Sequence, residues 1–353
     1  MLRSLHRAAT SPGSLLPRLR LLSTTPSDSP SSTNPLLAWR STDAPSGVSG
    51  VSSALPAFSR ITPDHVEPAI SALLGDFTRD LASFERGLGA DGAVSKYEDV
   101  VERLEVLRAP VANAWGCVGH LERVRNSDAL RDAHAEMQPK VVETLTTLGQ
   151  SRPIYAALKG LLDRHDDADA QVRHGQDTGA DGRLDATQER IVRSSLTQMK
   201  LSGVGLKGGG KDRFNALVQE SAKLSTVFSN NVMDATKAFK LTLTLEEEVE
   251  GLPSSALALA AQTAAQQQQQ QQAENGEEEE GESGDGPWTL TLDGPSFVAA
   301  MKHLKRSDLR EALYRAYITR ASDIAAQGDE SYDNAGNVER LLEIRAEMAA
   351  LLG

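Results

Sequence analysis

The sequence predicts a mainly α-helical protein that contains one small pair of β-strands. Alanine, leucine, glutamate and arginine fill long segments in which apolar residues recur every three or four positions, the period of an amphipathic helix. The segment from Tyr97 to Gly160 shows this period most clearly. Two short segments, 240–245 and 288–293, instead alternate leucine with threonine, which is typical of paired strands. With 353 residues, the chain is long enough to bury a sizeable core.

Individual helices are placed by their start signals and their apolar positions. Thr62 and Pro63 form a helix start, with a capping hydroxyl followed by a proline in the first turn, so His65 is expected to be structural. The apolar positions of the segment 97–160 include Val100, Val101, Leu104, Leu107, Val111, Ala114, Val118, Leu121, Val124 and Leu130. Another helical pattern covers 188–201, and a glycine-rich turn separates it from the next helix.

The helix after this turn carries one apolar stripe that is expected to be buried. Its members recur at three- and four-residue steps, and we expect Leu224, Phe228 and Val232 to lie in the core. Asn230 and Asn231 interrupt the stripe with two poor helix formers, so the helix is expected to continue under strain or to bend there. Such asparagines need a polar partner, and we expect packing or bend roles for them rather than contacts with a substrate.

The region between the two predicted strands is expected to be an insertion. Pro253 to Ala265 is predicted to form a short helix, and the glutamine- and glutamate-rich segment 266–286 is predicted to be a disordered loop because it has almost nothing to bury. Residues 241–301 contain twelve carboxylates and neither lysine nor arginine, whereas the whole chain has a net charge of −12. The remainder therefore sums to zero, and no basic footprint for a nucleic acid is present.

The first residues have the composition of an organellar transit peptide. Residues 1–27 contain Arg3, Arg7, Arg18 and Arg20, many serines and leucines, and no acidic residue. Their apolar runs are too short for a membrane span. We expect import into the mitochondrion, with the chloroplast, or both organelles, as the alternative. Residues 28–57 are then a flexible lead-in, and 58–353 form the helical body.

Several short motifs match part of a known chemical site, but structural roles are expected for them. Gly205–Lys211 has the GxxxxGK spacing of a phosphate loop, but Asp212 stands where a serine or threonine is needed and a helix precedes the loop, so nucleotide binding is disfavoured. His134 and Glu136 form an HxE fragment without the cysteines of a deaminase, and a solvated helix face is expected there. His120 is expected to be a hydrogen-bonded core residue. The single cysteine, Cys117, excludes an internal disulfide and has no base linked to it by any motif.

The glycine-rich turn and the helix after it resemble one family of enzymes. The turn reads GVGL at 203–206 and the helix reads LSTVFSNNVMDAT at 224–236. Further resembling segments are 34–37 (NPLL), 58–70, 119–124 (with His-Leu and Val in an HLxxV pattern), 313–322, 333–334 and 343–353. Together they are similar to the oligopeptidase A branch of the thimet oligopeptidase family of zinc metallopeptidases, which has organellar members. The resemblance covers about 34–353.

This resemblance implies a neurolysin-like helical N-terminal domain that forms one wall of a deep channel over a zinc ion. It also implies a metalloendopeptidase that hydrolyses short unstructured peptides, such as cleaved targeting peptides in an organelle. The zinc chemistry requires an HExxH motif, and none of the seven histidines begins one. We therefore expect no catalytic residue and no metal ligand in this chain, and its substrate-binding residues stay unassigned.

The resemblance stops at Gly353, before the region where the zinc motif would occur. We therefore expect this chain to be the non-catalytic N-terminal portion of such an enzyme, inactive by itself, with zinc bound only in the longer protein. Its partner would be the C-terminal catalytic portion, which would cover an apolar face exposed here. A non-catalytic helical module that binds peptides or proteins, and a truncated gene model, stay open as alternatives.

Overall fold

The computed structural model describes residues 34–40, 55–88, 96–173, 183–275, 286–325 and 332–353. The transit peptide expected at 1–27 lies outside these ranges. Of the lead-in expected to be flexible at 28–57, residues 34–40 and 55–57 are described. Asn34 caps a short 3-10 turn, Pro35–Leu37, and its side chain donates a 2.7 Å hydrogen bond to the carbonyl of His65. Leu36 and Trp39 are buried in the core, so this segment is anchored by apolar burial.

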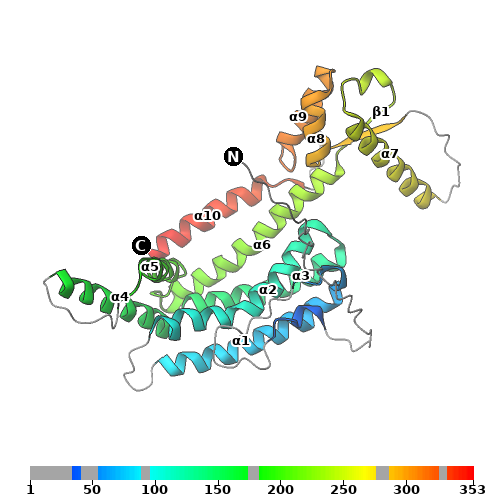
Figure 1. Cartoon of the computed structure of the whole chain (residues 1–353). Coiled ribbons are helices and arrows are strands. Elements are labelled where there is room, and N and C mark those ends of the chain that lie inside the picture. The colour runs from blue at the N-terminus through cyan, green and yellow to red at the C-terminus, as the bar shows by residue number, and fades with distance from the viewer. Residues whose placement is uncertain (1–33, 41–54, 89–95, 174–182, 276–285, 326–331) are drawn as a thin grey trace, which may run out of the picture. The chain divides into compact units, whose positions relative to one another are not determined.

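A first group of helices surrounds the larger of two hydrophobic clusters. It consists of α1 (Val66–Leu88), α2 (Arg103–Val124), α3 (Asp128–Gly149), α4 (Arg152–Arg173) and α5 (Ala186–Leu201). A single π-helical turn, Glu98–Glu102, leads into α2. The mainly α class predicted from the apolar period is confirmed, and the 97–160 pattern corresponds to this turn, α2, α3 and the first part of α4 (Figure 1).

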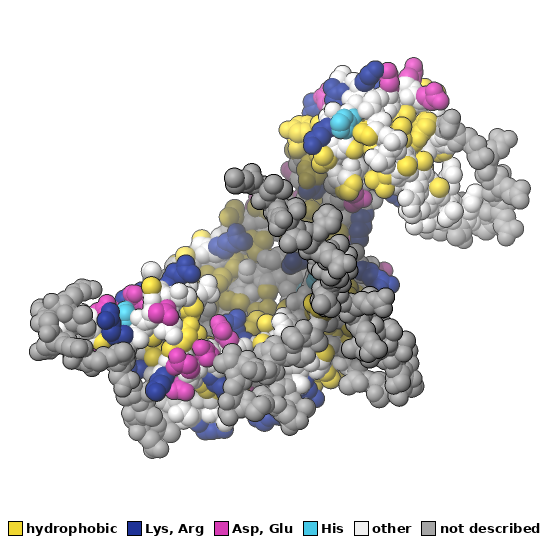
Figure 2. Space-filling model, in the orientation of Figure 1, with side chains coloured by type: hydrophobic (Ala, Val, Ile, Leu, Met, Phe, Trp, Pro, Cys, Tyr) yellow, Lys and Arg dark blue, Asp and Glu magenta, His cyan; other side chains and the backbone are white. Residues whose placement is uncertain are grey.

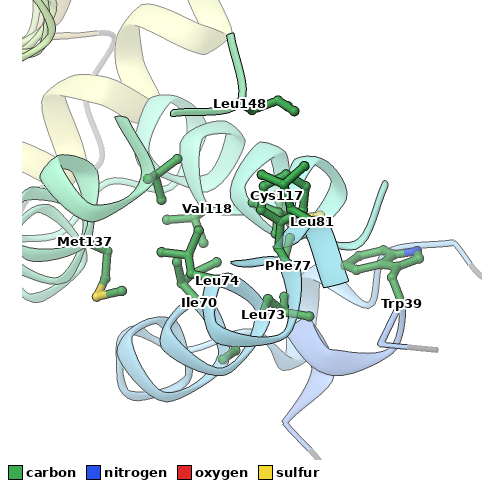
Figure 3. Close-up of a cluster of buried hydrophobic side chains, with 14 of the residues drawn as sticks. Trp39, Ile70, Leu73, Leu74, Phe77, Leu81, Cys117, Val118, Met137 and Leu148 are labelled. Carbon is green, nitrogen blue, oxygen red and sulfur yellow. The ribbon is translucent and has the colours of Figure 1, made fainter. Parts of the chain in front are cut away.

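Helix α1 shows how the apolar period builds this cluster. Ile70, Leu73, Leu74 and Phe77 follow the i, i+3, i+4, i+7 pattern, and all four side chains are buried. They point toward α2 and α3, which contribute Val118 and Met137 among others (Figure 3). Burial of each large apolar side chain stabilises the fold by about 1.5–3 kcal/mol. The start of α1 is fixed locally as expected, because the hydroxyl and the amide nitrogen of Thr62 both lie 3.1 Å from Nδ1 of His65.

A tight turn joins α5 to α6 (Gly208–Ala238). Gly203 has φ +83°, a left-handed conformation that side chains disfavour, and a Cβ atom at this position would lie 2.9 Å from Cδ1 of Leu206, which would have to shift. The expected glycine-rich turn between two helices is confirmed, although Gly208, Gly209 and Gly210 form the first turn of α6 itself. The helix then continues without interruption past Asn230 and Asn231.

A second hydrophobic cluster surrounds the predicted strand pair. Strands β1 (Lys240–Leu243) and β2 (Trp288–Thr291) are antiparallel, with Lys240 opposite Thr291 and Leu243 opposite Trp288. This pairing confirms the prediction, with each strand two residues shorter than expected. Helices α7 (Ser254–Asn275), α8 (Gly294–His303) and α9 (Ser307–Thr319) contribute the other side chains of the cluster, and α10 (Ala335–Leu352) follows. Among the described residues, no helix is long and apolar enough to cross a membrane.

Helix α7 corrects the boundary of the expected disordered loop. The short helix expected to end at Ala265 continues through the glutamine run to Asn275. Alanine and glutamine are good helix formers, and Ala260 and Ala264 are buried where α7 packs against β2. In addition, the buried hydroxyl of Thr289 donates a 3.1 Å hydrogen bond to Oε1 of Gln267. The part of the expected loop at 276–285 lies outside the described residues.

Candidate functional site

Helices α6 and α10 form an antiparallel pair that carries the candidate site. Arg213 near the start of α6 forms a two-pronged ion pair with Glu347 near the end of α10, at 2.6 and 2.7 Å. Farther along, Glu220 pairs with Arg340 at 2.6 and 2.9 Å. The partners run in opposite directions along the two helices, so α10 lies lengthwise beside α6 (Figure 1).

Asn334 fixes the beginning of α10 on α6. Its side chain is 3% exposed, and its Nδ2 donates to the carbonyl of Phe228 at 3.1 Å, while its Oδ1 accepts from Asn231 at 3.0 Å and from Asn337 at 2.9 Å. Its own amide donates to the carbonyl of Ala321 at 3.1 Å. Because four separate hydrogen bonds meet at this buried residue, the polar partner expected for the paired asparagines is identified for Asn231.

Helix α3 holds the opposite flank of α6. Arg131 binds both carboxylate oxygens of Asp234, at 2.5 and 2.7 Å, and this is the geometry that makes guanidinium–carboxylate pairs strong. Gln138 donates to Thr226 at 2.8 Å, and Gln219 donates to the carbonyl of Pro139 at 2.9 Å. With α10 on one side and α3 on the other, a strip of α6 lies between the two contacts.

This strip corrects the expectation that the stripe of α6 is buried along its whole length. Phe214 is 1% exposed and Leu217 is fully buried, but Leu224 and Val232 are only half-buried and Phe228 is 36% exposed. The period identified which side chains share a face, whereas burial depends on what lies over that face. Within the described residues, the second half of the stripe remains accessible to solvent.

The hydroxyl groups on this strip bind the helix that carries them. Ser225 donates to the carbonyl of Ser221 at 2.7 Å, Ser229 donates to the carbonyl of Ser225 at 2.9 Å, and Thr236 donates to the carbonyl of Val232 at 2.7 Å. Each hydroxyl proton is thus used within α6. The strip therefore offers small, mostly apolar contacts in which each hydroxyl keeps acceptor capacity.

Further apolar side chains are exposed on the neighbouring helices. On α10, Val338 and Leu342 stand four residues apart, and Leu342 is 59% exposed although Leu341 and Ile344 on the other face are buried. On α9, Tyr314 and Ile318 form a similar exposed pair. Hydrophobic side chains are visible among charged ones on the surface drawn in Figure 2. Exposed apolar residues at helical spacing on several neighbouring helices are typical of surfaces that contact another part of a protein.

Two histidines lie in environments opposite to those expected. His134 was expected on a solvated face, but it is buried, with its ring stacked on Trp115 at a centroid distance of 4.5 Å. Desolvation lowers the pKa of His134, against the opposing charge of Glu122. His120 was expected in the core, but it is exposed and its ring contacts Phe58 at 5.1 Å. The helix period did not reveal either environment, because both depend on which helix packs alongside.

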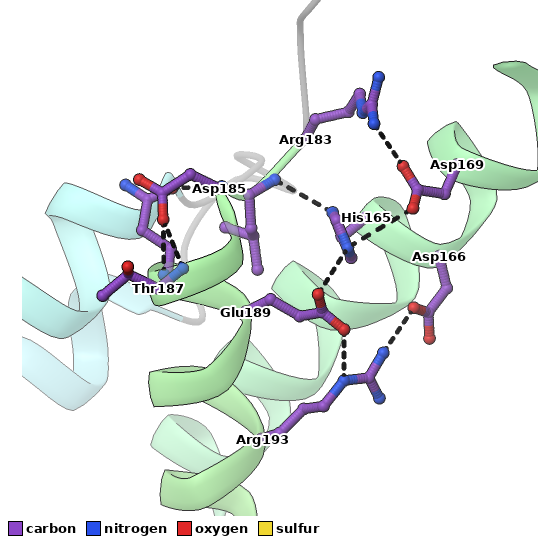
Figure 4. A network of polar contacts seen from close by, with 10 residues as sticks. His165, Asp166, Asp169, Arg183, Asp185, Thr187, Glu189 and Arg193 are labelled. Atoms are coloured by element: carbon purple, nitrogen blue, oxygen red, sulfur yellow. Dashed lines mark hydrogen bonds and ion pairs between the residues drawn. The ribbon is translucent and has the colours of Figure 1, made fainter.

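His165 belongs to a polar network that joins α4 to α5 (Figure 4). Its Nδ1 accepts a 3.1 Å hydrogen bond from the amide of Leu184, so in the neutral ring Nε2 carries the proton. Nε2 lies 3.5 Å from Glu189 and 3.9 Å from Asp169, and Arg183 binds Asp169 at 2.8 Å. These contacts join α4 to α5 through His165, Asp169 and Glu189.

The histidines of the described residues are dispersed over the structure. His65, His120, His134, His165 and His303 lie on five different elements of the structure. Among the residues that the structure describes, no group of three or more His, Cys, Asp or Glu side chains is arranged to hold a metal ion. Burial raises the pKa of the Cys117 thiol, which keeps that group in its unreactive protonated form.

Comparison with known proteins identifies the class to which this helical architecture belongs. The model of the Neurolysin/Thimet oligopeptidase N-terminal domain matches residues 70–211, which extend from α1 to the first turn of α6. The chain is thus similar to the helical N-terminal domain of a group of peptidases.

Curated relatives define the family more closely. The chain is 36% identical over 300 residues to the probable cytosolic oligopeptidase A of Arabidopsis thaliana, which covers 84% of this chain and 38% of that protein. It is 35% identical over 300 residues to the organellar oligopeptidase A (chloroplastic/mitochondrial) of the same plant, covering 84% and 33%. It is 34% identical over 299 residues to oligopeptidase A of Escherichia coli K12, covering 85% and 39%. The chain belongs to the thimet oligopeptidase/oligopeptidase A family, and it spans less than two fifths of the length of these relatives.

Proposed function

We propose that this chain forms the N-terminal, channel-wall part of a zinc metallo-oligopeptidase that hydrolyses short unstructured peptides. The observation that carries the proposal is the accessible strip of α6, which contains Ser225, Phe228 and Val232 between the contacts with α3 and α10. An extended peptide can lie along such a strip, because Phe228 and Val232 offer apolar contacts and the hydroxyl proton of Ser225 is already bonded within α6. Similarity to three oligopeptidases A supports the same assignment.

In this proposal the chain selects and positions peptides, and it supplies no ligand to the metal. Zinc, when bound to the catalytic portion of the complete enzyme, would activate the water that attacks the peptide bond. The exposed apolar pairs Val338–Leu342 and Tyr314–Ile318 are surfaces that the catalytic portion would cover. The chain alone should therefore be inactive toward peptides.

A direct test compares the isolated chain with a fusion to the remaining portion of oligopeptidase A from Escherichia coli. We expect the isolated chain to bind no stoichiometric zinc and to cleave no fluorogenic peptide. We expect the fusion to bind zinc and to cleave the peptide. Chelator-sensitive cleavage by the pure isolated chain would contradict the proposal. If the isolated chain binds short peptides tightly but the fusion remains inactive, the alternative of a non-catalytic peptide-binding module is supported instead.

The strip itself is tested in the fusion by adding bulk. Ser225→Trp places a large side chain on the strip, whereas Ser194→Trp places the same side chain on an exposed position of α5. We expect kcat/KM for a peptide of about ten residues to fall by at least tenfold with the first variant, a loss of about 1.4 kcal/mol in transition-state binding, and to change little with the second. Equal effects would show that the strip does not line the peptide path.

We also propose that the protein acts in the mitochondrion, with the chloroplast or both organelles as the alternative. The acid-free, arginine-containing composition of residues 1–27 and the similarity to an organellar oligopeptidase A support this location. Fusing residues 1–27 to a fluorescent protein should direct it to one of these organelles. A diffuse cytosolic signal from that fusion would contradict the proposal.

A further inference from the structure

Two ionisable side chains from neighbouring helices face each other in the interior. Glu122 near the end of α2 is 8% exposed and His134 of α3 is 6% exposed. Nε2 of the ring lies 3.8 Å from Oε2 of the carboxylate, which is close enough for a strong electrostatic interaction and too far for a hydrogen bond. The stacking contact with Trp115, with 16° between the ring planes, fixes the orientation of the imidazole. The two side chains are therefore held facing each other without a hydrogen bond between them.

Both partners retain a buried polar atom that has no hydrogen-bond partner. These atoms are Oε1 of Glu122 and Nδ1 of His134, as found among the described residues. Unsatisfied buried polar atoms are rare in folded proteins because each costs about 1–3 kcal/mol. The stability of a contact with two such atoms depends on the protonation state of its partners more than the stability of an ordinary packed contact does.

The charges that act on the ring come mainly from α2. Glu122 favours a protonated His134, whereas Arg123 opposes it. On α3 itself Arg131 is occupied by Asp234 of α6.

Ionisable groups on α1 and on the turn before it have partners of their own. On α1, Glu67 accepts a hydrogen bond from Ser71 at 3.0 Å. In the turn before α1, His65 contacts Thr62. Glu122 is therefore the carboxylate that acts on the ring of His134.

The pair is connected to the contact that holds α6. Asn126 donates a 2.7 Å hydrogen bond to the carbonyl of Glu122, and it accepts one of 2.7 Å from Nε of Arg131. The same guanidinium binds Asp234. His134 stands one helical turn after Arg131, so Asn126 and Arg131 connect the pair to the contact that fastens α6.

We propose that Glu122 and His134 form a proton-sensitive latch between α2 and α3, and that its opening weakens the Arg131–Asp234 contact with α6. The proposal is independent of the peptidase assignment, because it concerns only the contacts of these three helices. Burial lowers the pKa of His134 in the closed state, whereas in the open state the ring has its unperturbed pKa of about 6.5. At a pH between these two values, the open state binds a proton at His134 and the closed state does not. Opening is therefore favoured as the pH falls, by up to about tenfold per pH unit.

The test uses amide hydrogen exchange of the 353-residue chain, corrected for intrinsic rates, at several pH values between about 7.5 and 5.5. We expect the opening constant of the segment around residues 121–138 to rise by about tenfold per pH unit below pH 6.5. His134→Phe keeps a ring that can stack on Trp115 but cannot take up a proton, so this rise should disappear. His120→Gln, which removes an exposed histidine two residues before Glu122, should leave the rise unchanged. An identical pH dependence in the native chain and in His134→Phe would overturn the proposal.

A second measurement does not require the phenylalanine variant to fold. The imidazole resonances of the native chain can be followed by NMR, with the signal of His134 assigned by elimination from the spectra of single glutamine variants of the other six histidines, His6, His65, His120, His165, His174 and His303. We expect His134 to titrate below pH 6.5, and to titrate at a lower pH still in Glu122→Gln, because the carboxylate that favours the charged ring is then gone. Titration of His134 at or above its unperturbed value, or no change with Glu122→Gln, would refute the latch.

Discussion

Asn231 donates a 3.0 Å hydrogen bond from Nδ2 to Oδ1 of Asn334, a residue 103 positions later in the chain. This contact explains how α6 tolerates two consecutive asparagines. The side chain of Asn231 is used to dock the start of α10, and Asn334 in turn donates to the carbonyl of Phe228 on the same helix. An element that is unfavourable locally is thus stabilised by a distant partner.

Replacing Asn334 should therefore destabilise the fold more than replacing Asn230. Asn334→Ala leaves the amide of Asn231 and the carbonyl of Phe228 without their partner, and we expect a loss of about 2–3 kcal/mol in the free energy of unfolding. Asn230→Ala removes a half-buried side chain from the same helix and should change stability by less than about 0.5 kcal/mol. Urea denaturation of both variants measures the difference, and equal losses would show that Asn334 is not the docking residue.

Two phenylalanines of α6 should respond differently to truncation. Phe214 is fully packed, so Phe214→Ala should cost about 3–5 kcal/mol. Phe228 retains more than a third of its surface exposed, and Phe228→Ala should cost only about 1 kcal/mol in this chain. Denaturant midpoints of the two variants, compared at equal m-values, provide the measurement. A larger loss at Phe228 would mean that the strip is covered in solution.

The contact between α3 and α6 can be measured by a double-mutant cycle. Arg131 and Asp234 each have side chains that are 25% exposed, and their two-pronged geometry predicts a coupling free energy of about 1–2 kcal/mol. The pair Arg213–Glu347 has similar geometry but is more exposed, so its coupling should be smaller and should decrease further with added salt. Equal coupling free energies for Arg131–Asp234 and Arg213–Glu347 would show that partial burial does not strengthen the Arg131–Asp234 pair.

Asp76 should make the stability depend on pH at the acidic end. Its hydrogen bond with Arg40, at 2.6 Å, lowers the pKa of the carboxyl group, with Arg79 acting in the same direction and desolvation opposing it. The stabilisation is therefore complete above the unfolded value of about 3.9 and is lost as the pH falls through the lower folded value. Asp76→Asn should be less stable than the native chain at about pH 7 and indistinguishable from it once the carboxyl is protonated. A constant difference across this range would contradict the assignment.

Much of the secondary structure could be predicted because it depends on neighbours in sequence. The three- and four-residue period of α2, the helix start at Thr62 and Pro63, and the alternation in β1 and β2 act within a few positions, and the structure contains all of them. The boundary of α7 was missed because the glutamine run has no apolar period of its own. The glutamine run continues the helix because the alanines before it pack on β2 and because Gln267 accepts a hydrogen bond from Thr289.

The sequence by itself determined the helical class, the strand pair, the family resemblance and the absence of an HExxH motif, since each is a property of residue order. Only the tertiary structure decided which apolar face is covered and which histidine is buried. Phe228 and Phe214 lie on the same stripe, and His134 and His120 are both on amphipathic helices, yet their exposures differ. The reason is that burial depends on contacts between segments far apart in the chain, and a local pattern cannot show which segment will lie over it.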